Sequence, residues 1–129
     1  MITAICAKSV PPYDEWEIAT AGHPPPVLAA PGEPSTTIKL PVRPPLGAAP
    51  DLKRSAATVA LPAGGLMLLY TDGLIERRGE PLDVGFARLR ESIRPDPPRE
   101  VCRQVLHDLV GASGPGDDIA LIAIRRTSS

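Results

Sequence analysis

Hydrophobic and polar residues alternate along the first half of the chain in a way that predicts β-strands. The clearest case is Glu15–Ala21, whose apolar residues Trp16 and Ile18 fall on one face while its glutamates fall on the other. Turn residues such as Gly and Pro separate this segment from further short apolar or alternating runs. The additional strands or extended segments that we predict are Ile2–Lys8, Val27–Ala30, Thr36–Leu40 and Arg54–Leu61.

Two segments in the second half are apolar without a polar face. Gly65–Thr71 reads GLMLLYT, and Ile119–Ile124 reads IALIAI. A short continuous apolar run is typical of a strand that is covered on both faces. We therefore expect both segments to be buried strands.

The residues between these two segments predict two helices. Gly85–Ile93 and Arg99–Val110 carry apolar residues at helical spacing, with Asp96 as the expected N-cap of the second helix and Gly111 at its end. The apolar stripe of the second helix consists of Val101, Cys102, Val105, Leu106 and Leu109. Strands followed by two helices and a last strand predict an α+β fold with a mostly antiparallel sheet.

Length and charge restrict the class of protein further. A chain of 129 residues has room for a single domain, 1–129. Its 14 Lys+Arg against 15 Asp+Glu leave no basic surplus for a nucleic acid, and no segment approaches the roughly 18 apolar residues of a membrane span. The two cysteines, Cys6 and Cys102, form no paired or zinc-binding motif, so we expect a reduced, cytoplasmic protein with Cys102 as a core thiol.

Acidic residues mark two places where the buried strands begin or end. Asp72-Gly73 follows the first, and Asp117-Asp118 precedes the second. Neighbouring antiparallel strands would bring the end of one beside the start of the other, so the carboxylates would gather at one edge of the sheet. Such carboxylates repel one another unless a cation neutralises them, and oxygen ligands suit Mg²⁺ or Mn²⁺. Asp-Gly and Gly-Asp-Asp are also common turn sequences, and that alternative stays open.

Histidine and arginine residues offer weaker candidates for chemistry. His23 lies in AGHPPP at the end of a predicted strand, where it could be a ligand, a general acid or a residue that stabilises the turn. His107 falls on the polar flank of its helix and is expected to be a solvated surface residue. Arg77-Arg78 could attract a phosphate group, although solvated charge is the simpler interpretation.

Taken in order, five blocks of the sequence resemble one family. They are ATAGHPPPVL (19–28), PPLG (44–47), LPAGGLMLLYTDGLIE (61–76), FARLRESI (86–93) and GDDIALIAI (116–124). In this order and spacing they are similar to the bacterial SpoIIE-type branch of the metal-dependent protein phosphatases, which have the type 2C phosphatase fold. The resemblance implies a partial α-β-β-α sandwich of antiparallel sheets with helices packed outside.

The resemblance also implies a reaction and the residues that serve it. Enzymes of this family hydrolyse phosphoserine or phosphothreonine on proteins with two Mn²⁺ or Mg²⁺ ions, and a metal-bound water rather than a side chain attacks phosphorus. Asp72 matches a metal-binding aspartate, and Asp117 matches the last one, with Asp118 as the alternative or a supporting residue. Gly22 and His23 match a turn that lies near the site without binding the metals.

One motif of the family is absent from this sequence. No aspartate stands in the Gly-Asp-x-x-Gly-x-Gly/His motif that supplies an essential metal ligand. The chain thus resembles the C-terminal half of the catalytic domain, either as a fragment or as a short protein whose other half comes from elsewhere. With too few carboxylates for two metals, we expect weak metal binding and little phosphatase activity from this chain alone.

Two functions from different classes follow. The first is a protein serine/threonine phosphatase, or its C-terminal portion, that acts on a phosphoprotein such as an anti-anti-sigma-type regulator of a bacterial partner-switching pathway. The second is a catalytically inactive module that binds a protein partner or self-associates through the surface that the missing half would cover.

Overall fold

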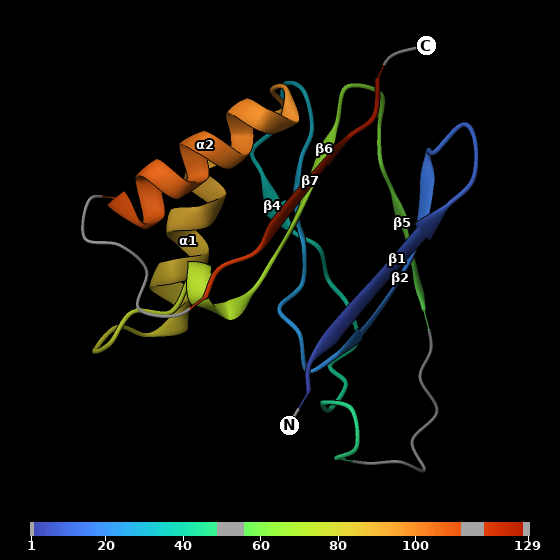
Figure 1. Ribbon diagram of the computed structural model, residues 1–129. Helices are drawn as coiled ribbons and strands as arrows, with labels where there is room; N and C mark the ends of the chain where they lie inside the picture. Colours follow the sequence, from blue (N-terminus) through green and yellow to red (C-terminus); the bar gives the residue numbers. More distant parts are fainter. Residues whose placement is uncertain (1, 49–55, 112–117, 128–129) are drawn as a thin grey trace.

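The computed structural model describes residues 2–48, 56–111 and 118–127, and these residues form two sheets and two α-helices (Figure 1). The first sheet has the order β1-β2-β5, and the second has the order β4-β3-β6-β7. Every strand pairing within them is antiparallel. The first sheet consists of β1 (Ala4–Ser9), β2 (Glu15–Ala21) and β5 (Ala57–Ala60). The second consists of β3 (Val27–Ala29), β4 (Thr36–Thr37), β6 (Leu66–Tyr70) and β7 (Leu121–Arg125).

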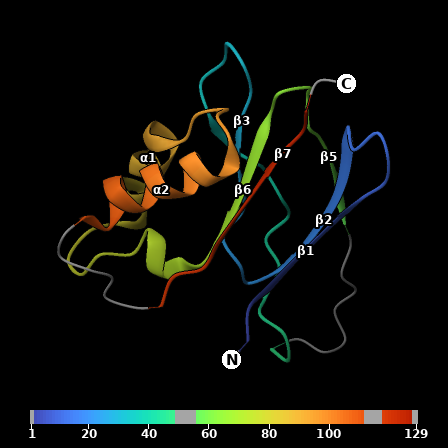
Figure 2. The same ribbon diagram turned by 45° about the horizontal axis from the view of Figure 1, so that its top comes forward.

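The helices cover only the second sheet. A 3₁₀ turn, η1 (Asp72–Leu74), follows β6, and it is succeeded by α1 (Leu82–Ser92) and α2 (Pro98–Leu109). Figures 1 and 2 show three layers, in which both α-helices lie on one side of the second sheet and the first sheet lies on its other side. The α+β class and the antiparallel sheets predicted from the sequence are confirmed.

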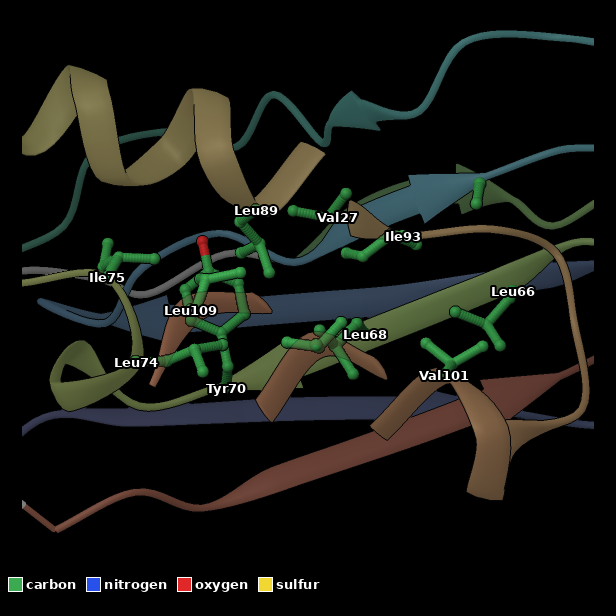
Figure 3. Close-up of a cluster of buried hydrophobic side chains, with 12 residues drawn as sticks. Val27, Leu66, Leu68, Tyr70, Leu74, Ile75, Leu89, Ile93, Val101 and Leu109 are labelled. Atoms are coloured by element: carbon green, nitrogen blue, oxygen red, sulfur yellow. The ribbon is translucent and has the colours of Figure 1, made fainter. Parts of the chain in front are cut away.

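Strand β6 lies at the centre of this arrangement. All five of its residues are buried, and they divide between two apolar clusters according to the period of two that a strand imposes. Leu66, Leu68 and Tyr70 pack toward the helices, in what we call the helix-side cluster (Figure 3). Met67 and Leu69 pack toward the first sheet. The prediction of a strand covered on both faces is therefore confirmed.

The predicted N-cap of α2 is wrong. The helix begins at Pro98, its N-cap is Pro97, and no side chain caps it. Two consecutive prolines explain the shift, because Pro97 has an extended ψ of 138° and Pro98 occupies the first helical turn, where no N–H is needed. Asp96 instead lies in the preceding turn, where its backbone N–H donates to the carbonyl of Arg94 at 2.8 Å.

Other boundaries also differ from the sequence prediction. The segment predicted as Thr36–Leu40 is a strand only over Thr36–Thr37. The N–H of Ile38 still donates to the carbonyl of Pro26 in the same register, but Pro26 has no N–H with which to continue the pairing. Helix α1 begins before the predicted Gly85, and η1 was not predicted.

His107 is exposed and Cys102 is half-buried against the helix-side cluster, as predicted. Burial raises the pKa of the Cys102 thiol, which favours its protonated form.

Gly85 allows α1 to approach the chain that follows η1. It is buried in the first turns of the helix, and a β-carbon added there would lie 2.1 Å from the carbonyl oxygen of Ile75. Ile75 is itself buried next to Leu74 in the helix-side cluster. Gly85 therefore fixes the distance between α1 and the turn that begins at Asp72.

We predict that Gly85→Ala lowers the free energy of unfolding by about 1–3 kcal/mol, because the added methyl group must displace backbone rather than a side chain. Urea denaturation of both proteins measures the difference. Glu91→Ala, at an exposed position of the same helix, is the control and should change the stability by less than about 0.5 kcal/mol. Equal losses for the two variants would contradict the close approach.

Candidate functional site

A cleft of about 500 Å³ opens where β6 ends. Four segments line it: the turn after β2, the loop that precedes the bridge at Leu46, the residues from Asp72 to Glu76, and the start of α1. Its charged and ionisable lining residues are His23, Arg43, Asp72 and Glu76. Most of its remaining lining is apolar and includes Pro24, Pro25, Leu40, Val42, Leu82 and Phe86.

Asp72 is held at the cleft by the transition from strand to 3₁₀ turn. Thr71 is still extended, and the Asp72 carbonyl accepts the N–H groups of Ile75 and Glu76, each at 3.0 Å. The next two residues after Gly73 are buried and anchor the turn in the apolar cluster. The backbone of Asp72 is thus fixed while its half-buried side chain faces the cleft.

The start of β7 lies beside the end of β6, as the sequence predicted. Tyr70 pairs with Leu121, and Thr71 and Ala120 exchange two hydrogen bonds, one of 3.1 Å between backbones and one of 2.9 Å to the Thr71 hydroxyl. Asp118 precedes this pairing by two residues and is exposed, although it does not line the cleft. Asp117 lies outside the described residues. Gly73 is the middle residue of η1.

His23 joins the turn after β2 to the end of β6. Its Nε2 lies 2.8 Å from the carbonyl oxygen of Tyr70. A carbonyl only accepts, so Nε2 carries the proton and Nδ1 has a free lone pair when the ring is neutral. Nδ1 is buried and has no hydrogen-bond partner among the residues that the structure describes. His23 therefore stabilises the turn, and it also brings an imidazole to the wall of the cleft.

Tyr70 makes a second connection to the same turn. Its hydroxyl donates to the carbonyl of Pro25 at 2.9 Å. Burial raises the pKa of Tyr70 far above its usual value, and this effect outweighs the opposing charge of Arg90. The phenol is therefore a neutral, permanent donor. We call the pair of contacts, His23 to the Tyr70 carbonyl and the Tyr70 hydroxyl to Pro25, the Tyr70 clamp.

Gly22 fits where no other residue would. Its φ is +63°, in the left-handed region, and its N–H donates to the carbonyl of Arg43 at 2.8 Å. A β-carbon at Gly22 would lie 2.6 Å from Cγ of Pro45. This contact fixes the loop that contains Arg43 against the turn that contains His23.

Two residues of the cleft were missed by sequence reasoning. Glu76 follows Asp72 by one helical turn, a spacing that could have indicated it. Arg43 reaches the cleft only through the contact between Gly22 and its loop, which no local pattern shows. Arg77 was weighed as a phosphate-attracting residue, but its guanidinium donates to the carbonyl of Leu109 at the end of α2.

The metal site expected from the family resemblance is only partly present in the described part of the chain. Asp72 and Glu76 supply hard carboxylate oxygens of the kind that Mg²⁺ and Mn²⁺ prefer, and both line one cleft. No group of three or more His, Cys, Asp or Glu side chains that could hold a metal ion occurs within residues 2–48, 56–111 and 118–127. The donors fit such an ion in kind, and further ligands would have to join them.

Comparison with known protein families identifies the family of this chain. Residues 1–127 match the family described as Stage II sporulation protein E (SpoIIE). The chain belongs to the SpoIIE family. Its fold and family resemble those of the PP2C serine/threonine phosphatases, as the sequence blocks had indicated. None of the described helices is long and apolar enough to cross a membrane.

Solved structures of other proteins share this fold. The RsbU and RsbW domains of Rv1364c from Mycobacterium tuberculosis match with a TM-score of 0.76 and 32% identity, over 90% of this chain and 34% of that one. The phosphatase domain of SpoIIE from Bacillus subtilis matches with a TM-score of 0.73 and 18% identity, over 98% of this chain and 57% of that one. The chain thus spans less than two thirds of either relative's length.

We predict that Gly22→Ala destabilises the protein more than Gly47→Ala does. Both glycines have a positive φ, so each substitution carries a backbone cost of about 1–2 kcal/mol. Of these two, only Gly22 brings the new methyl group against another described residue, because no atom of the described residues lies within 4 Å of the corresponding position at Gly47. Thermal denaturation of the two variants measures the difference, and equal losses would show that Pro45 does not press on the turn.

Proposed function

We propose that this chain forms the C-terminal part of a metal-dependent protein serine/threonine phosphatase domain and contributes part of its catalytic site. The observation that carries the proposal is that His23 and Asp72, from motifs far apart in the sequence, meet in one cleft at the end of β6. The chain belongs to the SpoIIE family, and its sequence blocks stand in the order of that family. This resemblance supports phosphate-ester hydrolysis as the chemistry of the cleft.

In this proposal Asp72 is a metal ligand, together with Asp117 or Asp118. A divalent cation at such a site lowers the pKa of water and neutralises charge on the phosphoryl group. Asp72 would hold the cation from a backbone that η1 and the apolar cluster fix. Glu76 places a second carboxylate in the same cleft. Gly22 and His23 hold the adjacent wall and take no part as ligands.

The complete domain would hold two Mn²⁺ or Mg²⁺ ions, and this chain would supply a minority of their ligands. Its relatives of known structure are longer, which supports the interpretation that other ligands lie in a part of the domain that this chain does not contain. We therefore expect the chain alone to bind Mn²⁺ weakly and to hydrolyse phosphomonoesters slowly.

The substrate in this proposal is a phosphoprotein, with a phosphorylated anti-anti-sigma-type regulator as the family resemblance suggests. The rim of the cleft supports a protein rather than a small metabolite. Val42 and Leu82 both line the cleft, although their side chains are 95% and 49% exposed. Exposed apolar side chains beside a few polar lining residues are typical of a surface that binds a polypeptide.

We predict that Asp72→Asn reduces Mn²⁺-dependent turnover at least about tenfold, because it removes the charge of a metal ligand without changing its shape. Hydrolysis of para-nitrophenyl phosphate and of a phosphoserine protein measures the effect. Asp83→Asn makes the same change in the first turn of α1, outside the cleft, and should leave turnover unchanged. Turnover that is the same in the Asp72 variant and the natural chain would contradict the assignment.

Manganese binding gives a second readout that does not need turnover. A titration of each protein with Mn²⁺, monitored by electron paramagnetic resonance, should show weaker binding for Asp72→Asn than for Asp83→Asn. If the natural chain shows no turnover but binds Mn²⁺, and Asp72→Asn loses this binding, the result would support an incomplete phosphatase site. If neither turnover nor Asp72-dependent binding is found, the alternative function follows, in which the chain is an inactive module that binds a protein or a second copy of itself.

We also predict that Val42→Ser lowers kcat/KM for a phosphoprotein about fivefold while hydrolysis of para-nitrophenyl phosphate stays unchanged, because one apolar contact worth about 1 kcal/mol is lost only with the larger substrate. Val42 is almost fully exposed, so folding should not suffer. Val10→Ser is the matched control, since Val10 is 74% exposed and does not line the cleft. An equal change for both substrates would contradict a role of the rim.

A further inference from the structure

The charges that line the cleft do not suit a phosphate ester by themselves. Asp72 and Glu76 are carboxylates, and a phosphomonoester is a dianion near neutral pH, so the three groups repel one another. Among the lining residues that the structure describes, Arg43 has the only lysine or arginine side chain. Any attraction that these residues exert on the phosphoryl group must therefore come largely from Arg43.

The backbone of Arg43 is held in place from several sides. Its carbonyl accepts the N–H of Gly22 at 2.8 Å, and the ring of Pro45 presses against the same glycine. Upstream, Ile38 is buried and bonded to Pro26, and downstream the N–H of Leu46 donates to Ile2 at 2.8 Å. Prolines at 41, 44 and 45 further restrict the loop. Arg43 is thus presented by a loop with little conformational freedom.

Three other arginines of the described chain illustrate a role in the fold. Arg77 donates to the end of α2, Arg90 to the hydroxyl of Thr37 at 3.2 Å, and Arg126 to the carbonyl of Leu61 at 3.0 Å. None of these three lines the cleft. Arg43 differs because it is half-buried and lines the cleft together with His23 and Asp72, and its backbone is bonded to Gly22 beside His23.

We infer that Arg43 is the phosphate-binding residue of this cleft, an inference that rests on the proposed phosphatase function. A guanidinium group matches two phosphate oxygens with two parallel N–H donors, which a lysine cannot do. Arg43 would orient the phosphoryl group on one side while Asp72 holds a cation on the other. The competing interpretation is that Arg43 only neutralises Asp72 and Glu76 and never contacts substrate.

Binding of inorganic phosphate to the whole chain, in buffer that contains a chelator to remove metal ions, separates the two interpretations. The proteins to compare are the natural chain, Arg43→Ala, Arg43→Lys and the control Arg99→Ala, in the exposed first turn of α2. We expect the dissociation constant, from phosphorus NMR titration, to rise about tenfold in Arg43→Ala and less in Arg43→Lys, with no change in the control. Circular dichroism shows whether each variant is folded.

Two results would overturn the inference: no saturable phosphate binding by the natural chain, or the same affinity in both Arg43 variants and the control. Should Arg43→Ala fail to fold, the affinity of Arg43→Lys decides. The outcome is separable from that of the proposed function. Asp72→Asn should reduce Mn²⁺-dependent hydrolysis at least about tenfold. It should not weaken phosphate binding in chelator, because it removes a negative charge. Arg43-dependent phosphate binding with neither hydrolysis nor Asp72-dependent Mn²⁺ binding would contradict the phosphatase and leave the inference standing.

Discussion

The Tyr70 clamp is the contact on which the geometry of the cleft depends. Strand β6 is buried on both faces, so its last residue is fixed by packing before any polar contact is made. From that fixed residue, the carbonyl holds His23 and the hydroxyl holds Pro25. Asp72 follows two residues later. The turn that contains His23 and the turn that begins at Asp72, which both line the cleft, are therefore positioned by one residue of the core.

Much of the fold could be predicted because most of the sequence is locally consistent. The alternation in Glu15–Ala21 predicts β2 with its observed bounds, and the continuous run around β6 predicts burial on both faces. The errors fall where two local signals compete. Asp96 is a good N-cap by type, yet the following prolines delay the helix. The strand at Thr36 ends early because Pro26, which accepts the N–H of Ile38, has no N–H of its own for further pairing.

The site was predictable only in part, and the limit is physical. Asp72 could be found because strand ends that carry acids must meet in an antiparallel pair, and the pairing of Tyr70 with Leu121 confirms that geometry. Arg43 could not be found, because a loop without hydrophobic periodicity gives no information on what it packs against. Its position follows from the absence of a β-carbon at Gly22, a contact that only the folded chain reveals.

The two halves of the cleft are stabilised in different ways, and this difference bears on its chemistry. The clamp uses a carbonyl acceptor, a neutral phenol and an imidazole, so it positions Asp72 without neutralising it. A carboxylate that is fixed but not neutralised retains its attraction for a cation, whereas a salt bridge would have used that attraction for folding. In the proposed function, the charge of Asp72 stays available for a cation, and Arg43 supplies the opposite charge from a separately anchored loop.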